Sequence, residues 1–334
     1  MNYSNSQRAG VILYLAASLF GGYDKTLIFA FTTNLSLMTL ERAKYFAEHN
    51  CYIMCSIDGP QIIHDAYRVD AKGNGTFDKA MDGLRNLLIA YGDNAKTHIK
   101  FNVVVCPPYS RKKLNAIKEF FEKLDYLPEG IDVKYSYVES GSLRKEDIDY
   151  TYFPEGEDIV GAVPPIDIWL AEELPKQSSD ESVVCTLARD ALVRVQKRFL
   201  LDHPCEKMKR NGCCIPGGRR IYVDINGDIA LCERVGKSPF LGNINKGIEL
   251  ERVKKYYLEE YEKASVEQCK NCWAVNLCNM CYAACYRENG INIEAKNELC
   301  KYQRDQLKGE LIMYHQVMET NPEILNYIQD IELT

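Results

Sequence analysis

Short apolar and β-branched runs alternate with helical patterns through the first part of the chain. The runs that predict β-strands are 26–33, 51–58, 98–106 and 132–138. Helical patterns lie between them at 40–49, 77–91 and 114–124. In the second of these helices, one face carries Phe77, Met81, Leu84 and Leu88. Short strands that alternate with helices of this length predict an α/β fold with a parallel sheet.

The second half of the chain follows a different pattern, with one predicted hairpin among helices. Helices are predicted at 188–201, 250–264 and 302–319, whereas 139–184 is mixed. Two short runs, 220–225 and 228–233, flank Asn226-Gly227. Because Asn-Gly supplies the two residues with positive φ that a type I′ turn needs, a hairpin closed by that turn is predicted.

An apolar run occupies 11–20, near the N-terminus. It is too short to span a bilayer. The single Arg8 before it and the lack of a clear cleavage site make it a poor signal peptide. We therefore expect a buried helix that ends at Gly21-Gly22, a cytoplasmic protein and no membrane partner.

Composition sets broad limits on the chain. With 334 residues, 46% of them hydrophobic, it can build a sizeable core as two domains or as one α/β unit with an appendage. The net charge is −6, and Lys and Arg are scattered among acidic residues without a basic stripe. Nucleic acid is therefore not an expected partner.

Cysteine content changes this picture. The chain has 14 cysteines, and most of them lie between Cys205 and Cys300. A disulfide framework in a secreted protein could produce such a group. The CxxC steps instead favour metal ligation in a reducing cytosol, because two thiolates three positions apart can bind one metal centre.

Eight cysteines are the predicted ligands: Cys214, Cys232, Cys269, Cys272, Cys278, Cys281, Cys285 and Cys300. Eight thiolates match the needs of two four-iron clusters. They equally match two zinc sites of four thiolates each, and the spacing alone leaves both readings open. Cysteines used only as small hydrophobic residues are the third reading, which the density of CxxC pairs disfavours.

The order of these cysteines resembles the SPASM region of radical S-adenosylmethionine (SAM) peptide maturases. The resemblance rests on Cys214-x12-Gly227-x4-Cys232, then Cys269-x2-Cys272-x5-Cys278, then Cys300. It implies two auxiliary 4Fe-4S clusters, one held by Cys214 and Cys232 and the other by Cys269, Cys272, Cys278 and Cys300. The family places a further cysteine where this chain has Tyr282, so either Cys281 or Cys285 would complete the first cluster, with Cys205 and Cys213 as spare candidates.

The first half of the chain resembles the same family. The matching segments are Phe31-Thr32-Thr33-Asn34, Ser56-Ile57-Asp58-Gly59-Pro60, His64-Asp65, Arg68, Gly73 to Asp78, and Asn102. The resemblance implies that Ser56, Arg68 and Asn102 contact SAM. It also aligns Glu233, directly after Cys232, with an acid that anaerobic sulfatase-maturating enzymes use as a catalytic base. Without the family, Asp58-Gly59-Pro60 reads as a turn, and Arg68 and Glu233 as surface charges.

One motif of the family is absent from this sequence. Radical SAM enzymes use CxxxCxxC, whose three thiolates hold a four-iron cluster and leave one iron open to SAM. Cys51 and Cys55 have the first spacing, but Asp58 stands at the third position, and Gly21-Gly22 is followed by Tyr23 where the family has a Gly-Gly-Glu type of loop. The resemblance begins at the third strand of the family's barrel. A partial (β/α) barrel without its first strands is therefore expected, from either a truncated product or a natural partner protein.

These observations predict a partial radical SAM barrel at 1–140, a bridging helical segment at 141–204, a SPASM iron–sulfur domain with a hairpin and two cluster-binding loops at 205–305, and a C-terminal helix at 306–334. The predicted function is that of a radical SAM/SPASM-type protein related to enzymes that modify ribosomally made peptides. SAM would be a cofactor only if the barrel is completed. The expected partners are a peptide and a complementing catalytic subunit. The alternative is a non-catalytic iron–sulfur or zinc module that recruits a peptide or such a subunit, so the sequence leaves open whether this chain is itself an enzyme.

Overall fold

The computed structural model of the chain describes residues 28–138, 142–161, 163–198, 214, 216–217, 221–232, 238–281, 285–329 and 331. The described residues form two compact units. Within the described residues, the first unit comprises the segments 28–161, Ile168–Asp190 and Val317–Tyr327. The second unit comprises the segments 163–167, Ala191–Gln316 and 328–331. The helix predicted at 11–20 and the Gly21-Gly22-Tyr23 segment lie outside the described residues.

The first unit contains a sheet and a layer of helices. Its strands are β1 (Ala30–Thr33), β2 (Tyr52–Ser56), β3 (Ile99–Val105) and β4 (Asp132–Tyr137). Its helices include α2 (Leu40–Glu48), α3 (Gln61–His64), α4 (Phe77–Tyr91), α5 (Ala95–His98) and α6 (Arg111–Glu122). Shorter 3-10 segments are η1 (Gly92–Asn94), η2 (Lys145–Asp147) and η3 (Leu174–Lys176). Later elements that contribute to it are α7 (Pro165–Glu173), α8 (Val183–Gln196) and η6 (Pro322–Ile328).

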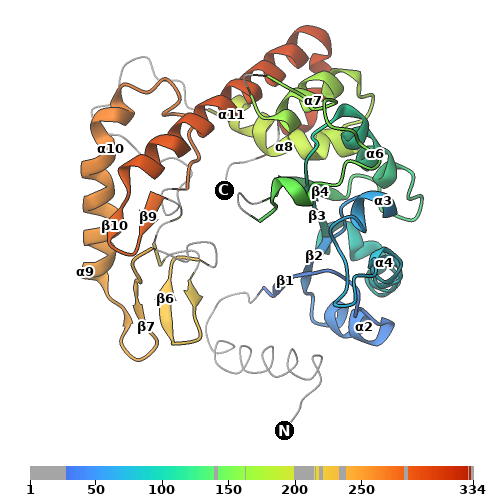
Figure 1. Ribbon diagram of the computed structural model, residues 1–334, viewed down its shortest axis with the longest axis horizontal. Helices are drawn as coiled ribbons and strands as arrows, with labels where there is room; N and C mark the ends of the chain where they lie inside the picture. The colour runs from blue at the N-terminus through green and yellow to red at the C-terminus, as the bar shows by residue number, and fades with distance from the viewer. Residues whose placement is uncertain are drawn as a thin grey trace. The chain divides into compact units, whose positions relative to one another are not determined.

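The sheet is parallel throughout, in the order β1-β2-β3-β4. This confirms the predicted α/β class, and each predicted strand contains an observed one. Helices α2, α4 and α6 lie on one side of the sheet (Figure 1). The helix predicted at 188–201 corresponds to α8, which covers Val183–Gln196 and therefore begins and ends earlier than predicted.

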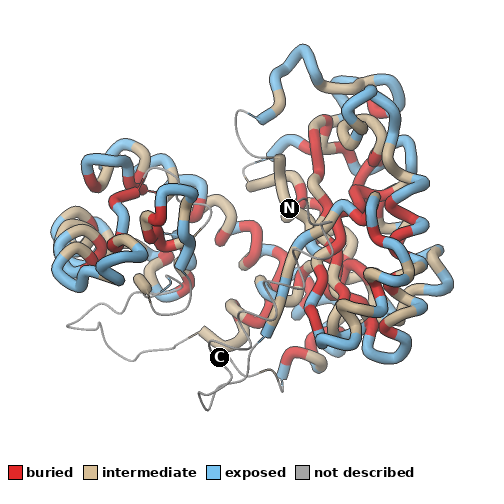
Figure 2. Tube along the Cα trace, turned by 90° about the horizontal axis from the view of Figure 1, so that it is seen from below, coloured by how far each residue is buried: buried red, intermediate tan, exposed pale blue. Residues whose placement is uncertain are grey.

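Burial alternates along β3 and separates the two faces of the sheet. Phe101, Val103 and Val105 are buried, whereas Lys100 and Asn102 are half-buried. The buried side chains face the helix layer, where Phe101 contacts the Phe121 ring of α6 at 5.1 Å between centroids. Buried segments accordingly run through this unit (Figure 2). The opposite face carries the polar residues of the strands.

Four cysteines outside the CxxC region are part of this core. Cys51, Cys55, Cys106 and Cys185 are all buried. Cys51 and Cys55 flank Ile53 with the two-residue period of a strand, so both side chains point to the helix side of the sheet. Burial raises the pKa of Cys55, and it raises that of Cys106 to about 11. These thiols therefore stay protonated and pack as small hydrophobic groups.

The second unit contains small antiparallel sheets and the helices of the cysteine-rich region. Its strands are β5 (Tyr222–Val223), β6 (Asp228–Ala230), β7 (Gly242–Asn243), β8 (Gly247–Ile248), β9 (Tyr286–Arg287) and β10 (Gly290–Ile291). Its main helices are α9 (Leu250–Arg252), η4 (Val253–Glu260), α10 (Tyr261–Lys270) and α11 (Ile293–Thr320). The first three are continuous in sequence, and η4 has π-helical geometry.

The predicted type I′ turn is wrong. Strand β5 pairs antiparallel with β6, as a hairpin requires. Gly227 has a φ of 82°, but Asn226 does not have positive φ. The Gly227 N–H donates to the Asp224 carbonyl at 3.1 Å, and the Asp224 side chain accepts from the Asn226 N–H at 2.8 Å. Asp224 thus caps a longer loop, which removes the need for positive φ at Asn226.

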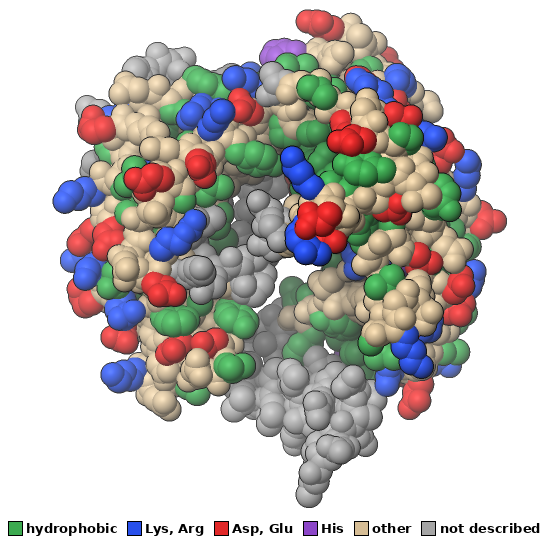
Figure 3. All heavy atoms as spheres, viewed as in Figure 1, with side chains coloured by type: hydrophobic (Ala, Val, Ile, Leu, Met, Phe, Trp, Pro, Cys, Tyr) green, Lys and Arg blue, Asp and Glu red, His purple; other side chains and the backbone are tan. Residues whose placement is uncertain are grey.

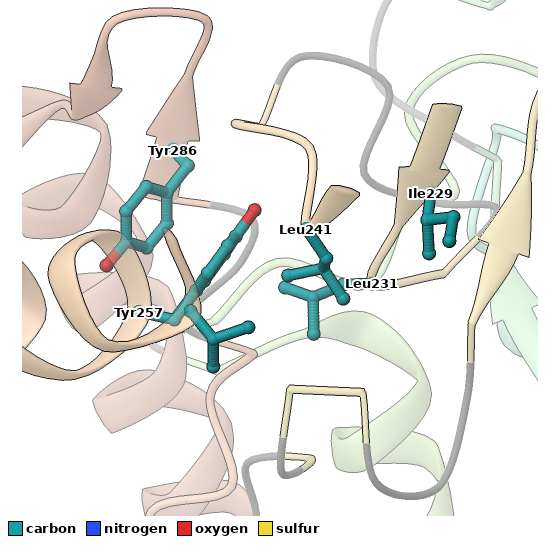
Figure 4. Packing of buried hydrophobic residues seen from close by; sticks show 6 residues of the cluster. Ile229, Leu231, Leu241, Tyr257 and Tyr286 are labelled. Carbon is teal, nitrogen blue, oxygen red and sulfur yellow. The ribbon is translucent and has the colours of Figure 1, made fainter. Parts of the chain in front are cut away.

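A cluster of apolar side chains packs the hairpin sheet against the following helix. It contains Ile229, Leu231, Leu241, Val253, Tyr257 and Tyr286, all buried. Figure 4 shows Tyr257 between Tyr286 and the leucines. The two tyrosine rings lie 4.9 Å apart. The Tyr257 hydroxyl donates to the Pro239 carbonyl at 2.5 Å, so its polar end is satisfied inside the cluster.

The predicted four-segment division stays a prediction. The two observed units group the residues differently, because the boundary between them falls within α7, α8 and α11. Helix α11 also begins earlier than the predicted 302–319. Asn292 starts it by accepting the Ala295 N–H at 2.7 Å, a capping signal that the helical periodicity alone does not contain.

We expect Gly83→Ala to lower the free energy of unfolding by about 2 kcal/mol. A Cβ at Gly83, in α4, would lie 2.3 Å from the Leu35 carbonyl oxygen. Leu35 has a φ of 65°, so this tight turn has little freedom to move away. Urea unfolding measures the change. Arg85→Ala, an exposed change on the same helix, should shift the stability by less than about 0.5 kcal/mol. A Gly83→Ala protein more stable than the wild type would contradict the close approach.

Candidate functional site

A buried carboxylate organises the loop after β2. Asp58 is only 7% exposed at its side chain, and its two oxygens accept from Arg68 Nε at 2.5 Å and Arg68 Nη2 at 2.9 Å. The Val104 N–H of β3 donates to Asp58 Oδ1 at 2.9 Å. This bidentate pair holds one edge of the Arg68 guanidinium and leaves donors on its other edge.

His64 joins this network in its neutral form. Its Nδ1 accepts from the Asp58 N–H at 3.3 Å, so the ring proton resides on Nε2, which lies 3.2 Å from Thr76 Oγ1. Thr76 Oγ1 in turn donates to the Arg68 carbonyl at 2.9 Å. Burial lowers the pKa of His64, opposed by the nearby Asp58 charge and reinforced by Arg68. The loop between β2 and α4 is therefore fixed by hydrogen bonds at both of its ends.

Ser56 and Asn102, two residues predicted to contact SAM, lie side by side. Ser56 of β2 is the register partner of Asn102 of β3, and Asn102 is the register partner of Lys134 of β4. Paired residues on neighbouring strands share a face, so these side chains form a row on the side away from α2, α4 and α6. The Ser136 hydroxyl donates to Asn102 Oδ1 at 3.4 Å. The row supplies hydroxyl and amide groups suited to a polar ligand.

Four of the eight predicted metal ligands are neighbours in the second unit. Cys269 ends α10, Cys272 and Cys278 lie in the loop after it, and Cys300 lies on α11. Burial raises the pKa of Cys269, and the charges of Cys300, Cys272 and Cys278 raise it further. The pKa of Cys278 is raised by burial and then by Cys300 and Cys272. These four thiols therefore lie within electrostatic reach of one another.

The surroundings of these four thiols are apolar on one side and cationic on another. Ala274, Leu277 and Leu307 form a buried cluster against which Cys272 packs. Lys296 is fully buried and donates from Nζ to Cys300 Sγ at 3.8 Å. Within the described residues, no group of three or more His, Cys, Asp or Glu side chains is arranged to hold a metal ion. Four neighbouring cysteine thiols, with an ammonium beside one of them, are therefore the described features of this site.

The other four predicted ligands differ in their surroundings. Cys285 is buried, Cys232 is half-buried against the Tyr257 cluster, and Cys214 and Cys281 are exposed. The structure does not gather these four as a metal-ion site among the described residues. Glu233 and the spare candidates Cys205 and Cys213 lie outside the described residues. The assignment of this second group stays a prediction.

Two residues with a place in these sites were not singled out by their sequence pattern. Asp58 was placed in the family match or interpreted as part of a turn, and neither interpretation made it the partner of Arg68. Lys296 was not considered, although it precedes Cys300 by four positions and therefore lies on the same face of α11. Helical spacing from a ligand was the one signal that could have found it.

The surface adds two observations. On the face shown in Figure 3, Lys and Arg side chains are interspersed with Asp and Glu. No helix within the described part of the chain has both the length and the apolar character needed to cross a membrane.

No protein-family model matches the chain. The chain is 29% identical over 99 residues to a cysteine-type anaerobic sulfatase-maturating enzyme of Clostridium novyi (strain NT), which covers 29% of this chain and 25% of that protein. It is 45% identical over 60 residues to a serine-type anaerobic sulfatase-maturating enzyme of Bacteroides thetaiotaomicron, covering 18% of this chain and 14% of that protein. The matched segments thus span a quarter or less of these relatives.

The solved structures extend the likeness along the chain. Native anSMEcpe with bound AdoMet and Cp18Cys peptide matches with a TM-score of 0.61 at 18% identity, covering 97% of this chain and 83% of that one. At this identity the match establishes the fold alone. The chain therefore has homology to anaerobic sulfatase-maturating enzymes, which belong to the radical SAM enzymes, and an α/β fold with a parallel sheet like that of anSMEcpe.

The neutral state of His64 predicts a pH dependence. Because its pKa is lowered in the folded state, the unfolded chain binds a proton more readily below pH about 6.5, and His64 should destabilise the fold as the pH falls from 7 to 5. His64→Asn keeps an acceptor for the Asp58 N–H without a titrating ring, so it should weaken that decline. The measurement is the difference in unfolding free energy between variant and wild type at each pH.

The unfolding free energy of the variant has to be compared with that of the wild type at each pH, because another group changes the stability with pH in the opposite direction. Burial raises the pKa of Asp167 to about 7, which favours the folded state as the pH falls. Parallel profiles for the wild type and His64→Asn would show that His64 does not titrate as argued.

Proposed function

We propose that this chain is a radical SAM/SPASM-type protein that binds two auxiliary 4Fe-4S clusters and is related to enzymes that modify ribosomally made peptides. The observation that supports the proposal most directly is the grouping of Cys269, Cys272, Cys278 and Cys300. Four cysteine thiolates are the donor set of a four-iron cluster. These residues would hold one cluster, and such a cluster supplies one-electron transfer when bound.

A four-iron cluster and a zinc ion are the two readings of this set of four thiols, and they differ in how the sulfur ligands are arranged. A tetrahedral zinc ion draws its four sulfur ligands to about 2.3 Å from one centre. A cube of four irons holds its thiolates farther apart, because each binds a different iron. The spacing of the cysteines in the sequence leaves both readings open, and the resemblance to radical SAM/SPASM maturases favours the four-iron cluster.

The other auxiliary cluster would be held by Cys214 and Cys232, with Cys281 or Cys285 completing it and Cys205 and Cys213 as the further candidates for its fourth ligand. Cys214 and Cys232 flank the β5–β6 hairpin in sequence, and this hairpin is anchored by the Tyr257 cluster. Glu233, next to Cys232, would act as a base on the substrate in a complete site. This assignment rests on the family resemblance and on the spacing of the cysteines.

A peptide is the proposed substrate or partner. The support is the homology to enzymes that mature sulfatases and the likeness to anSMEcpe, whose solved structures contain peptides. Ser56 and Asn102, on the face of the sheet away from α2, α4 and α6, would contact part of a SAM molecule. Arg68 would do so through the donors that Asp58 leaves unused.

The alternative proposal is a non-catalytic module that uses its metal sites to recruit a peptide or a complementing catalytic subunit. The absence of CxxxCxxC from this sequence favours it. Cys51 and Cys55, which have the first spacing of that motif, are buried towards the helix layer. An upstream reading frame that encodes CxxxCxxC would favour the enzyme, whereas a separate maturase encoded nearby would favour the module.

Anaerobic reconstitution should load about eight irons per chain and give the brown colour of thiolate-bound iron. Cys300→Ser should lose about half of that iron, because it removes one ligand of one of the two clusters. Cys185→Ser, a buried cysteine outside the predicted ligands, serves as the control and should retain all of it. Iron analysis of the three proteins checks the proposal, and wild-type protein that binds only zinc would overturn it.

We expect no cleavage of SAM by this chain alone. Reductive cleavage needs an iron with an open coordination position, and a cluster with four cysteine ligands has none. The test incubates the reconstituted protein with SAM and dithionite and measures 5′-deoxyadenosine against a cluster-free control. Product above the control would contradict the expectation. Product that appears only after a fragment with CxxxCxxC is added would favour a split enzyme.

A further inference from the structure

Lys296 is a buried cation with an unusual set of partners. Its side chain lies on α11 with a relative exposure of 0%. Its Nζ donates to Gln268 Oε1 at 2.6 Å and to Cys300 Sγ at 3.8 Å. Among the described residues, no carboxylate forms an ion pair with it. A charge removed from water needs compensation by an opposite charge, so its anionic partner has to be found nearby.

The thiols around Lys296 supply that partner. Its positive charge lowers the pKa of Cys269, against the larger opposing effect of burial. It acts in the same sense on Cys278. Lys296 thus lies within electrostatic reach of at least three of the four grouped cysteines, one of which it contacts directly. A four-iron cluster with four thiolate ligands carries net negative charge, and the ammonium beside Cys300 would be its counter-charge.

Local structure fixes the ammonium in this position. Asn292 caps α11, and the Lys296 N–H donates to the Asn292 carbonyl at 3.1 Å, so Lys296 lies in the first turns of a well-formed helix. Cys300 follows by one helical turn on the same face. Gln268, next to Cys269 on α10, accepts from the ammonium and holds it between the two helices that carry the ligands.

We propose that Lys296 is the internal counter-ion of the four-iron cluster at Cys269, Cys272, Cys278 and Cys300, and that it raises the reduction potential of that cluster. This inference rests on the proposed function, since it requires the cluster. Adding one electron makes the cluster more negative, so a fixed cation stabilises the reduced form more than the oxidised form. Net charge and hydrogen bonds to sulfur are the features that set such potentials.

The test is an anaerobic redox titration with dithionite, followed by electron paramagnetic resonance, on the full chain after iron loading. Lys296→Met keeps the length of the side chain and removes its charge. It should retain the wild-type iron content and shift one of the two reduction steps to a more negative potential. We expect a change of at least tenfold in the one-electron equilibrium constant, or about 59 mV.

Lys301→Met is the matched control. It removes the same charge one position after Cys300, but Lys301 is exposed, so water and salt screen it. Both of its reduction steps should stay within twofold of the wild type. Full iron content with unchanged potentials in Lys296→Met would overturn the inference while leaving the proposed function intact. Wild-type protein without iron–sulfur clusters would overturn both the inference and the proposed function. Iron analysis of the wild type shows this outcome before any variant is made.

A second variant decides the matter if Lys296→Met loses its cluster. Gln268→Glu preserves the size of the side chain and places a carboxylate at the atom that now accepts from Lys296. The new ion pair would neutralise the ammonium without removing it. A more negative potential for one step in Gln268→Glu would support the counter-ion role, and an unchanged potential would refute it.

Discussion

The carboxylate of Asp58 joins β2, β3 and the loop before α4 in the first unit. It follows β2, accepts a main-chain hydrogen bond from β3, and binds Arg68 through both of its oxygens. The cost of burying this charge is offset by three donors. Since the adjacent His64 and Thr76 hold the far end of the same loop, the ends of two neighbouring strands are linked to the start of α4. Ser56, which forms the polar row with Asn102, lies two positions before Asp58 in the chain.

A buried charge also needs compensation in the second unit, where the charge is positive. There the buried charge is a cation, and the structure surrounds it with thiols and one amide oxygen in place of carboxylates. Asp58 has all of its compensation within the described residues. Among the described residues, the direct partners of Lys296 are a neutral amide and a thiol, so in the proposed function its compensation comes from the cluster. Asp58 is therefore a charge that the fold itself compensates, whereas Lys296 is, in the proposed function, a charge compensated by a bound cluster.

Much of the first unit could be predicted from sequence, because strand and helix periodicity reflect local burial. Helix α4 has the predicted bounds, and the four strands differ from expectation only at their ends. The turn at Asn226 could not be assigned, since a hydrogen bond from Asp224 replaced the conformation that Asn-Gly prefers. The π-helical stretch of η4 has no periodic signature of its own.

The sequence singled out the four grouped cysteines but not the residues around them, and the role of these cysteines as ligands stays a prediction. Cysteine spacing identified the four residues that the fold brings together, because CxxC steps constrain the chain over short distances. The role of Asp58 was hidden, since its partner Arg68 lies across a loop whose closure depends on His64 and Thr76. Lys296 was hidden by its residue type, because lysine is almost always a surface residue.

The four grouped thiols share one further property, which is their closeness along the chain. All of them, together with Gln268 and Lys296, belong to the continuous stretch 268–300. Closing a short loop costs less conformational entropy than closing a long one, so this site can form from local contacts while distant segments are still unfolded. The other predicted set has to bring Cys214 to residues beyond 280. For the two proposed clusters, the connectivity of the chain therefore favours acquisition of metal first at the C-terminal site.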